Sequence, residues 1–159
     1  MHLFFLRHGI AEDRNTAAND FDRKLIPEGI SEIERLAQGL KRLDLKLDRI
    51  YTRPLPRSDE TARIVAGALE IGPENLIVEP ELAPGQFDMD QLRALLKDER
   101  RQTRIMFVGH EPDLSLLVEQ LVGGASIDLK KGGLARVEAN RVEPGCGVLR
   151  WLLTPAHLG

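Results

Sequence analysis

The chain has 159 residues, enough to bury a sizeable core, and its 42% hydrophobic and 30% charged residues are ordinary for a globular protein. A formal net charge of −3 gives no reason to expect nucleic-acid binding, so any anion site would need a local cluster of arginines. The single cysteine, Cys146, excludes an internal disulfide and favours a reducing, cytoplasmic setting. The apolar stretch at the start is too short to span a membrane and lacks the features of a signal peptide.

Apolar periodicity predicts alternating strands and helices along the chain, and no repeat or linker interrupts them, so a single domain over 1–159 is expected. The predicted strands are His2–Leu6, Arg49–Thr52, Leu76–Val78, Ile105–Val108, Leu134–Ala139 and Val148–Leu153. The predicted helices are 27–43, 56–69, a helix capped by Asp88 that carries Leu92, Leu95 and Leu96, and 112–122.

This order predicts an α/β fold, a three-layer sandwich with a mostly parallel sheet and helices on both faces. The last two strands are joined by a turn around Pro144 and Gly145, which predicts an antiparallel edge. In such sheets ligands bind outside the carboxyl ends of the strands.

Three of the predicted strands end on polar residues. The first ends at Arg7 and His8, the second is followed by Arg53 and Arg57, and the apolar strand Ile105–Val108 leads to His110. Arginine forks match phosphate oxygens, and helix amino ends add backbone donors. The sequence therefore predicts a phosphoryl-binding site at this edge of the sheet.

These motifs resemble the histidine phosphatase superfamily, and more narrowly its small SixA-type phosphohistidine phosphatases. The stretches that carry the resemblance are LRHGIAE at 6–12, DRKLIPEG at 22–29, YTRPLPRSDETA at 51–62, PELAPG at 80–85, FVGHEP at 107–112 and LKKGGLA at 129–135. RHG alone is a weak match, but the set in this order covers nearly the whole chain.

The resemblance implies that His8 is the nucleophile and that Arg7, Arg57 and a protonated His110 bind the phosphoryl group. A neutral imidazole is a competent nucleophile near pH 7, and a covalent phosphohistidine divides the transfer into two easier steps. The cationic side chains supply the charge that a metal would otherwise bring, so neither a metal nor a cofactor is expected.

The sequence departs from the family pattern at two of these motifs. Arg53 stands where the family usually has serine, and is either an extra phosphate or substrate contact or a surface arginine. Ile26 replaces a small hydroxyl residue and is expected to weaken the cap of the following helix.

No secure proton donor can be assigned. Larger relatives carry an acid near the segment matching 80–85, where this chain offers Glu81, Pro84 and Gln86; Glu12 and Asp13 are further possibilities. A phosphohistidine substrate has an imidazole leaving group, which needs a proton less than an alkoxide does. The expected substrate is therefore phosphohistidine on a signalling protein such as a phosphorelay domain. The alternatives are a small phosphate ester and, from another class, a phosphoryl-binding module without catalysis.

Each candidate also has a purely structural interpretation. His8 and His110 are plausible structural residues at a strand exit and a helix start, and Arg57 has Asp59 and Glu60 as possible salt-bridge partners. Glu81 is expected to be a solvated carboxylate.

Four further features have no partner motif. His2 and His157 are expected to be incidental and Cys146 to be a loop or strand-start residue. The Lys130–Gly133 stretch is either a solvated turn or a docking point for an acidic partner.

Overall fold

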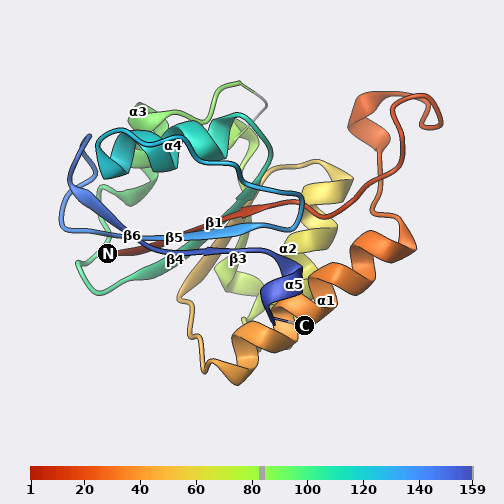
Figure 1. Cartoon of the computed structure of the whole chain (residues 1–159), viewed down its shortest axis with the longest axis horizontal. Helices are drawn as coiled ribbons and strands as arrows, with labels where there is room; N and C mark the ends of the chain where they lie inside the picture. The colour runs from red at the N-terminus through yellow and green to blue at the C-terminus, as the bar shows by residue number, and fades with distance from the viewer. Residues whose placement is uncertain (83–84, 159) are drawn as a thin grey trace.

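The computed structural model describes residues 1–82 and 85–158 and contains a six-stranded sheet (Figure 1). Its strands are β1 (His2–Arg7), β2 (Arg49–Thr52), β3 (Leu76–Val78), β4 (Arg104–Gly109), β5 (Leu134–Ala139) and β6 (Gly147–Leu153). The strand order is β3-β2-β4-β1-β5-β6. β3, β2, β4 and β1 are mutually parallel, whereas β5 is antiparallel to both β1 and β6. The predicted mostly parallel sheet with an antiparallel edge is confirmed.

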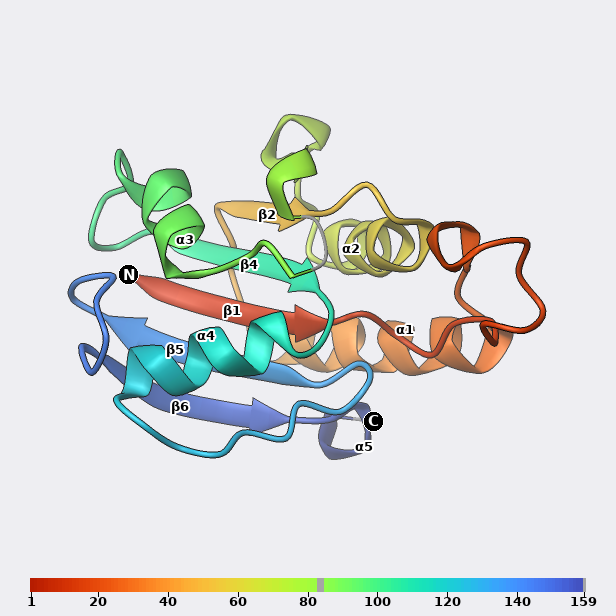
Figure 2. The same cartoon turned by 90° about the horizontal axis from the view of Figure 1, so that it is seen from above.

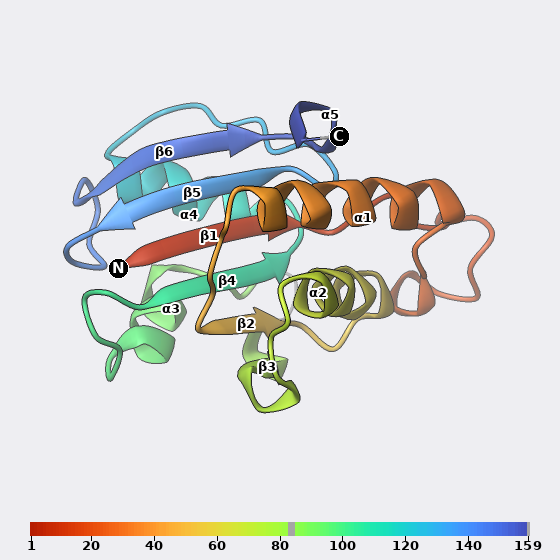
Figure 3. The same ribbon diagram turned by 90° about the horizontal axis from the view of Figure 1, so that it is seen from below.

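Helices cover both faces of the sheet, which confirms the three-layer α/β architecture (Figures 1 and 3). The helices are α1 (Pro27–Arg42), α2 (Pro56–Ala68), α3 (Met89–Leu96), α4 (Asp113–Val122) and α5 (Pro155–Leu158), with short 3₁₀ helices η1 (Asp20–Asp22), η2 (Pro73–Asn75) and η3 (Pro80–Leu82). α3 and α4 lie on one face, and α1, α2 and α5 lie on the other.

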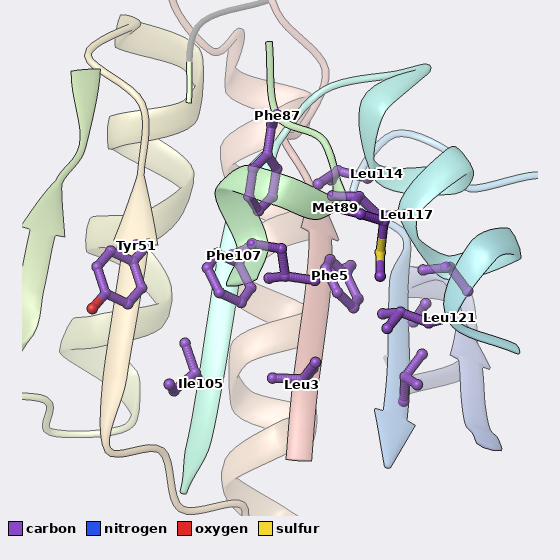
Figure 4. Packing of buried hydrophobic residues seen from close by; sticks show 14 of the residues in the cluster. Leu3, Phe5, Tyr51, Phe87, Met89, Ile105, Phe107, Leu114, Leu117 and Leu121 are labelled. Carbon is purple, nitrogen blue, oxygen red and sulfur yellow. The ribbon is translucent and has the colours of Figure 1, made fainter. Parts of the chain in front are cut away.

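The core on the α3–α4 face is built around an aromatic ladder across three strands (Figure 4). Phe5 of β1 pairs with Phe107 of β4, and Phe107 pairs with Tyr51 of β2. The ring centroids are 5.7 Å and 5.5 Å apart, and Phe87 packs on Phe107 at 5.3 Å. Stacked rings in register hold the three central strands at fixed relative heights, so their carboxyl ends are fixed as well.

α1 begins with Pro27 at its first turn, and its N-cap, Ile26, makes no side-chain capping bond, as the departure from the family pattern predicts. Ile33, Leu36, Ala37 and Leu40 are buried, as the periodicity predicts. Two residues of that pattern are exposed instead: Ile30, and Leu43, which is 53% exposed because the helix ends one residue earlier.

The chain between β1 and α1 projects beyond the carboxyl ends of the parallel strands (Figure 2). It contains η1, which the sequence did not predict, and Phe21, which is exposed. No helix within residues 1–82 and 85–158 has the length and apolar character needed to cross a membrane.

Candidate active site

The three polar strand exits lie side by side because β2, β4 and β1 are neighbours in the sheet. Arg7 pairs with Gly109 in the register of β1 and β4, and the His8 amide donates to the Gly109 carbonyl at 2.9 Å. Thr52 of β2 pairs with Val108, so Arg53 leaves its strand beside the start of the His110 turn. Residues far apart in the sequence are thereby brought to one edge.

His8 is 5% exposed, and its ring is oriented by a bond to the next residue. Its Nδ1 lies 2.7 Å from the Gly9 carbonyl oxygen, which only accepts, so Nδ1 carries the proton of the neutral ring. The Nε2 lone pair is then free to attack an electrophile. The Gly9 amide donates to Thr61 Oγ1 at 3.1 Å, and the Thr61 hydroxyl donates to the Arg57 carbonyl at 2.7 Å. Thr61 thus ties the His8 turn to the first turn of α2.

The pKa of His8 is lowered to about 3, mainly by burial and in smaller part by the positive charges of Arg57 and Arg7, while the hydrogen bond to the Gly9 carbonyl opposes the shift. The imidazole is therefore neutral over the physiological pH range. An imidazole must be neutral to act as a nucleophile, because a protonated ring has no free lone pair on nitrogen.

Arg7 is held by the turn that precedes β5. Its amide donates to the Gly133 carbonyl at 3.0 Å, and its guanidinium donates to the Leu129 carbonyl at 3.0 Å. In return, the Gly132 amide lies 3.2 Å from the Arg7 carbonyl and 3.0 Å from the His8 carbonyl. Gly132 has a φ of +68°, a conformation that favours glycine. The Lys130–Gly133 stretch is a turn whose backbone fixes Arg7 and His8.

Arg57 is buried near the start of α2 and contacts neither Asp59 nor Glu60 through its side chain. Its guanidinium donates to the Asp20 main-chain carbonyl at 2.8 Å and lies 3.5 Å from the Asp20 carboxylate. Arg23 holds the same carboxylate at 3.0 Å. Asp20 could not be identified from the sequence, where it is one of several polar residues in a loop.

Four buried guanidinium nitrogens have no hydrogen-bond acceptor within the described residues: Nε of Arg7, Arg53 and Arg57 in this site, and Nε of Arg136 on β5. Unpartnered buried donors of charged groups are costly in a native structure and commonly mark a binding site. An oxyanion with several acceptor oxygens is the chemical class that such donors suit.

Arg53 is 1% exposed, so its interpretation as a surface arginine is wrong. Its guanidinium contacts His110 Nδ1 and lies 3.6 Å from the carboxylate of Asp113, which is also buried. The Asp113 carboxylate accepts from the Gly85 amide at 2.9 Å. A buried carboxylate needs a cationic partner, and the ion pair with Asp113 accounts for the burial of Arg53.

His110 differs from the protonated group that the family resemblance suggests. Burial first and the adjacent Arg53 charge second lower its pKa to about 4, while Asp113 opposes the shift. The side chain is half-buried and neutral at neutral pH.

The carboxylates considered as proton donors are occupied elsewhere or exposed. Glu12 accepts from the Lys24 amide at 3.0 Å, Asp13 accepts within its own turn, and Glu81 is exposed on η3. Pro84 lies outside the described residues, whereas Gln86 is exposed. Asp20 is closer, but its hydrogen bond to Arg23 lowers its pKa, so it is an anion at neutral pH.

The remaining histidines and the cysteine belong to other parts of the chain. His2 contacts Arg136, His157 contacts the Thr154 amide, and Cys146 is a free, half-buried thiol. Within residues 1–82 and 85–158, no group of three or more histidine, cysteine or acidic side chains is arranged to hold a metal ion.

A doubly covered α/β sheet whose strand exits bring together two neutral histidines, the buried Arg53 and Arg57 and the half-buried Arg7 defines a protein able to hold a phosphoryl group. The family model of the histidine phosphatase superfamily, branch 1, matches residues 3–89, more than half of the chain. The chain belongs to this superfamily.

Two relatives and one solved structure indicate which members of the superfamily the chain resembles. An uncharacterized protein of Picosynechococcus is 36% identical over 155 residues, covering 88% of this chain and 90% of that protein. The phosphohistidine phosphatase SixA of Escherichia coli is 28% identical, covering 99% and 96%. The structure of the protein histidine phosphatase SixA complexed with tungstate superposes with a TM-score of 0.86 at 27% identity, covering all of both chains. The resemblance to SixA-type proteins that the motifs indicate is confirmed.

Proposed function

We propose that this chain is a phosphohistidine phosphatase that works through a covalent phosphohistidine at His8, without a metal or cofactor. The observation that carries the proposal is the hydrogen bond of His8 Nδ1 to the Gly9 carbonyl at 2.7 Å, which leaves Nε2 free beside the charges of Arg57 and Arg7. A module that only binds phosphate needs no oriented, neutral imidazole.

In the first step the His8 Nε2 lone pair attacks phosphorus, and the phosphorus–nitrogen bond of the substrate histidine breaks. The bonding pair leaves with the substrate imidazole, which takes its proton from solvent. Positive charge develops on the His8 ring as Nε2 bonds to phosphorus, and the Gly9 carbonyl stabilises it through Nδ1–H. Arg7 and Arg57 bind the equatorial phosphoryl oxygens.

In the second step a water oxygen attacks phosphorus, and the bond to Nε2 breaks. The pair returns to Nε2, the water proton passes to solvent, and inorganic phosphate leaves. His8 is then neutral again, as its lowered pKa favours.

None of Glu12, Asp13, Glu81 and Asp20 is an assignable proton donor, which supports phosphohistidine over an ester. Glu81 is exposed and Asp20 is an anion, so neither is suited to protonate an alkoxide. The relative named phosphohistidine phosphatase SixA supports the same choice. We place the partner, a phosphorelay domain or another phosphohistidine protein, in the cytoplasm. A small phosphate ester, turned over by the same steps, is the alternative substrate.

The test compares wild type, His8→Ala and His157→Ala on a phosphohistidine protein and on p-nitrophenyl phosphate. His157 is an exposed histidine near the C-terminus and is the matched control. After acid and alkaline quenching, alkali-stable, acid-labile phosphate on the enzyme reports the covalent intermediate.

We expect fast loss of phosphohistidine and slow ester turnover, both abolished in His8→Ala and retained in His157→Ala. Fast ester turnover would instead select the small-molecule alternative. Turnover of neither substrate by wild type, with tungstate still bound, would overturn the hydrolase and leave a phosphoryl-binding module.

A further inference from the structure

The buried contact between Arg53 and His110 determines the protonation state of His110. A guanidinium has five N–H donors and no acceptor, so a hydrogen bond between arginine and histidine requires the ring nitrogen to accept. The Arg53 nitrogen that contacts Nδ1 of His110 lies 3.4 Å from Nε2, so Nδ1 is the acceptor. A ring nitrogen that accepts carries no proton.

Burial and an ion pair hold Arg53 in this position. Its side chain is 1% exposed, and the buried Asp113 carboxylate at 3.6 Å anchors its outer nitrogen. The same carboxylate is fixed by the Gly85 amide. Burial lowers the pKa of Arg53 to about 10, so it remains a cation at neutral pH.

Three charged groups near His110 lower its pKa, and one raises it. Arg53 approaches from the exit of β2, Arg57 from α2 and Arg7 from β1, and all three disfavour an imidazolium. Asp113 on α4 opposes them, but it is already paired with Arg53.

The neighbouring acid does not change this balance. Glu111 binds the amide and hydroxyl of Ser115. Its carboxylate is therefore committed to the first turn of α4.

We propose that Arg53 is a positioning residue that holds His110 as the neutral tautomer with its proton on Nε2, so that the arginine carries the positive charge. His110 then presents one N–H donor to a phosphoryl oxygen over the whole physiological pH range. A serine at position 53, usual in the family, has no charge to do this. The arginine thus makes the donor independent of pH.

The inference is tested by long-range ¹H–¹⁵N correlation spectra of the full-length ¹⁵N-labelled protein. The chain has four histidines, and a His110→Gln spectrum assigns the signal of interest. At pH 7 we expect an unprotonated Nδ1 and a protonated Nε2, with no titration of His110 between pH 5.5 and 8. An imidazolium, or a proton on Nδ1, would overturn the proposal without any variant of Arg53.

Arg53→Met removes the charge while keeping an unbranched side chain, and Arg53→Lys keeps the charge. In Arg53→Met we expect the His110 midpoint to rise by at least one pH unit, about tenfold in proton affinity. Arg53→Lys should lie between that variant and wild type. The matched control is Arg63→Met, an exposed arginine of α2 paired with Asp59, which should leave His110 unchanged.

Equal midpoints in wild type and Arg53→Met would contradict the role given to Arg53. These spectra need no turnover, so this inference and the proposed function fail separately. If the chain is a phosphatase, kcat/KM of Arg53→Met acquires an ionisation that the wild-type pH profile lacks.

Discussion

The buried, neutral His8 should make the protein sensitive to acid, and His8→Gln should relieve part of that sensitivity. The pKa of His8 is about 3 in the native state against an ordinary value of 6.5. Because the pKa of His8 is depressed in the native state, its contribution to the free energy of unfolding is fully present above pH 6.5. This contribution is lost as the pH falls toward 3, because the unfolded chain then binds a proton that the native state does not bind.

The magnitude follows from the two pKa values. At pH 5 the pH is about 1.5 units below the ordinary pKa that His8 has in the unfolded chain, which corresponds to about 2 kcal/mol, whereas at pH 7 the effect is only about 0.2 kcal/mol. Glutamine is uncharged at both values. Between pH 7 and pH 5, His8→Gln should therefore lose about 2 kcal/mol less of its free energy of unfolding than wild type.

Urea unfolding at pH 7 and pH 5 measures this difference, and comparing each protein with itself cancels any change in packing that the substitution causes. His110 is present in both proteins, so its own titration cancels as well. His157→Gln, at an exposed position, should follow wild type. If wild type and His8→Gln lose equal stability on acidification, the reasoning that His8 is buried in its neutral form is refuted.

Two further substitutions test the loop that carries Asp20 and its packing on α1. A Cβ at Gly29 would lie 2.1 Å from the Ile10 carbonyl oxygen, so Gly29→Ala should lower the free energy of unfolding by about 2 kcal/mol in urea titrations. The control is Gly67→Ala, which has open space around it and should raise the free energy of unfolding by about 0.5 kcal/mol. A stable Gly29→Ala would show that the loop yields easily. The Asp20 carboxylate is partly exposed and 3.5 Å from Arg57, so Asp20→Asn should weaken tungstate binding less than about fivefold by calorimetry, against about a hundredfold for Arg57→Met. Equal losses in the two variants would mean that the carboxylate, not the main-chain carbonyl of Asp20, holds Arg57.

The sheet-edge cluster could be predicted because it depends on a local pattern. An apolar strand followed at once by Arg7 and His8, or by Gly109 and His110, places polar side chains at a strand end in any parallel sheet. What the pattern does not contain is the strand order. The neighbours β2, β4 and β1 follow from side-chain packing such as the Phe5–Phe107 pair, which long-range contacts determine.

The partners of the arginines could not be predicted for the same reason. Asp20 lies 37 residues before Arg57, and Asp113 is on a different helix from the one that follows Arg53. Nearby acids such as Asp59 offer simpler pairings in the sequence, but Asp59 points along the outside of α2 to Arg63. The burial of Arg53 follows from the position of Asp113 at the start of α4, which becomes visible only when the elements are packed.

Under the proposed function, the charge distribution bears on how a phosphorylated partner would be captured. The chain has a formal net charge of −3, yet Arg7, Arg53 and Arg57 gather at one edge while both nearby histidines are neutral. At physiological ionic strength charges are screened beyond about 8 Å, so this cluster attracts a phosphoryl group at short range and gives little long-range steering. Selection between a protein and a small ester must then come from contacts around the site, where the exposed loop between β1 and α1 projects beyond the strand ends. Raising the ionic strength should therefore lower the affinity for tungstate, whereas the association rate of a phosphohistidine protein should change less.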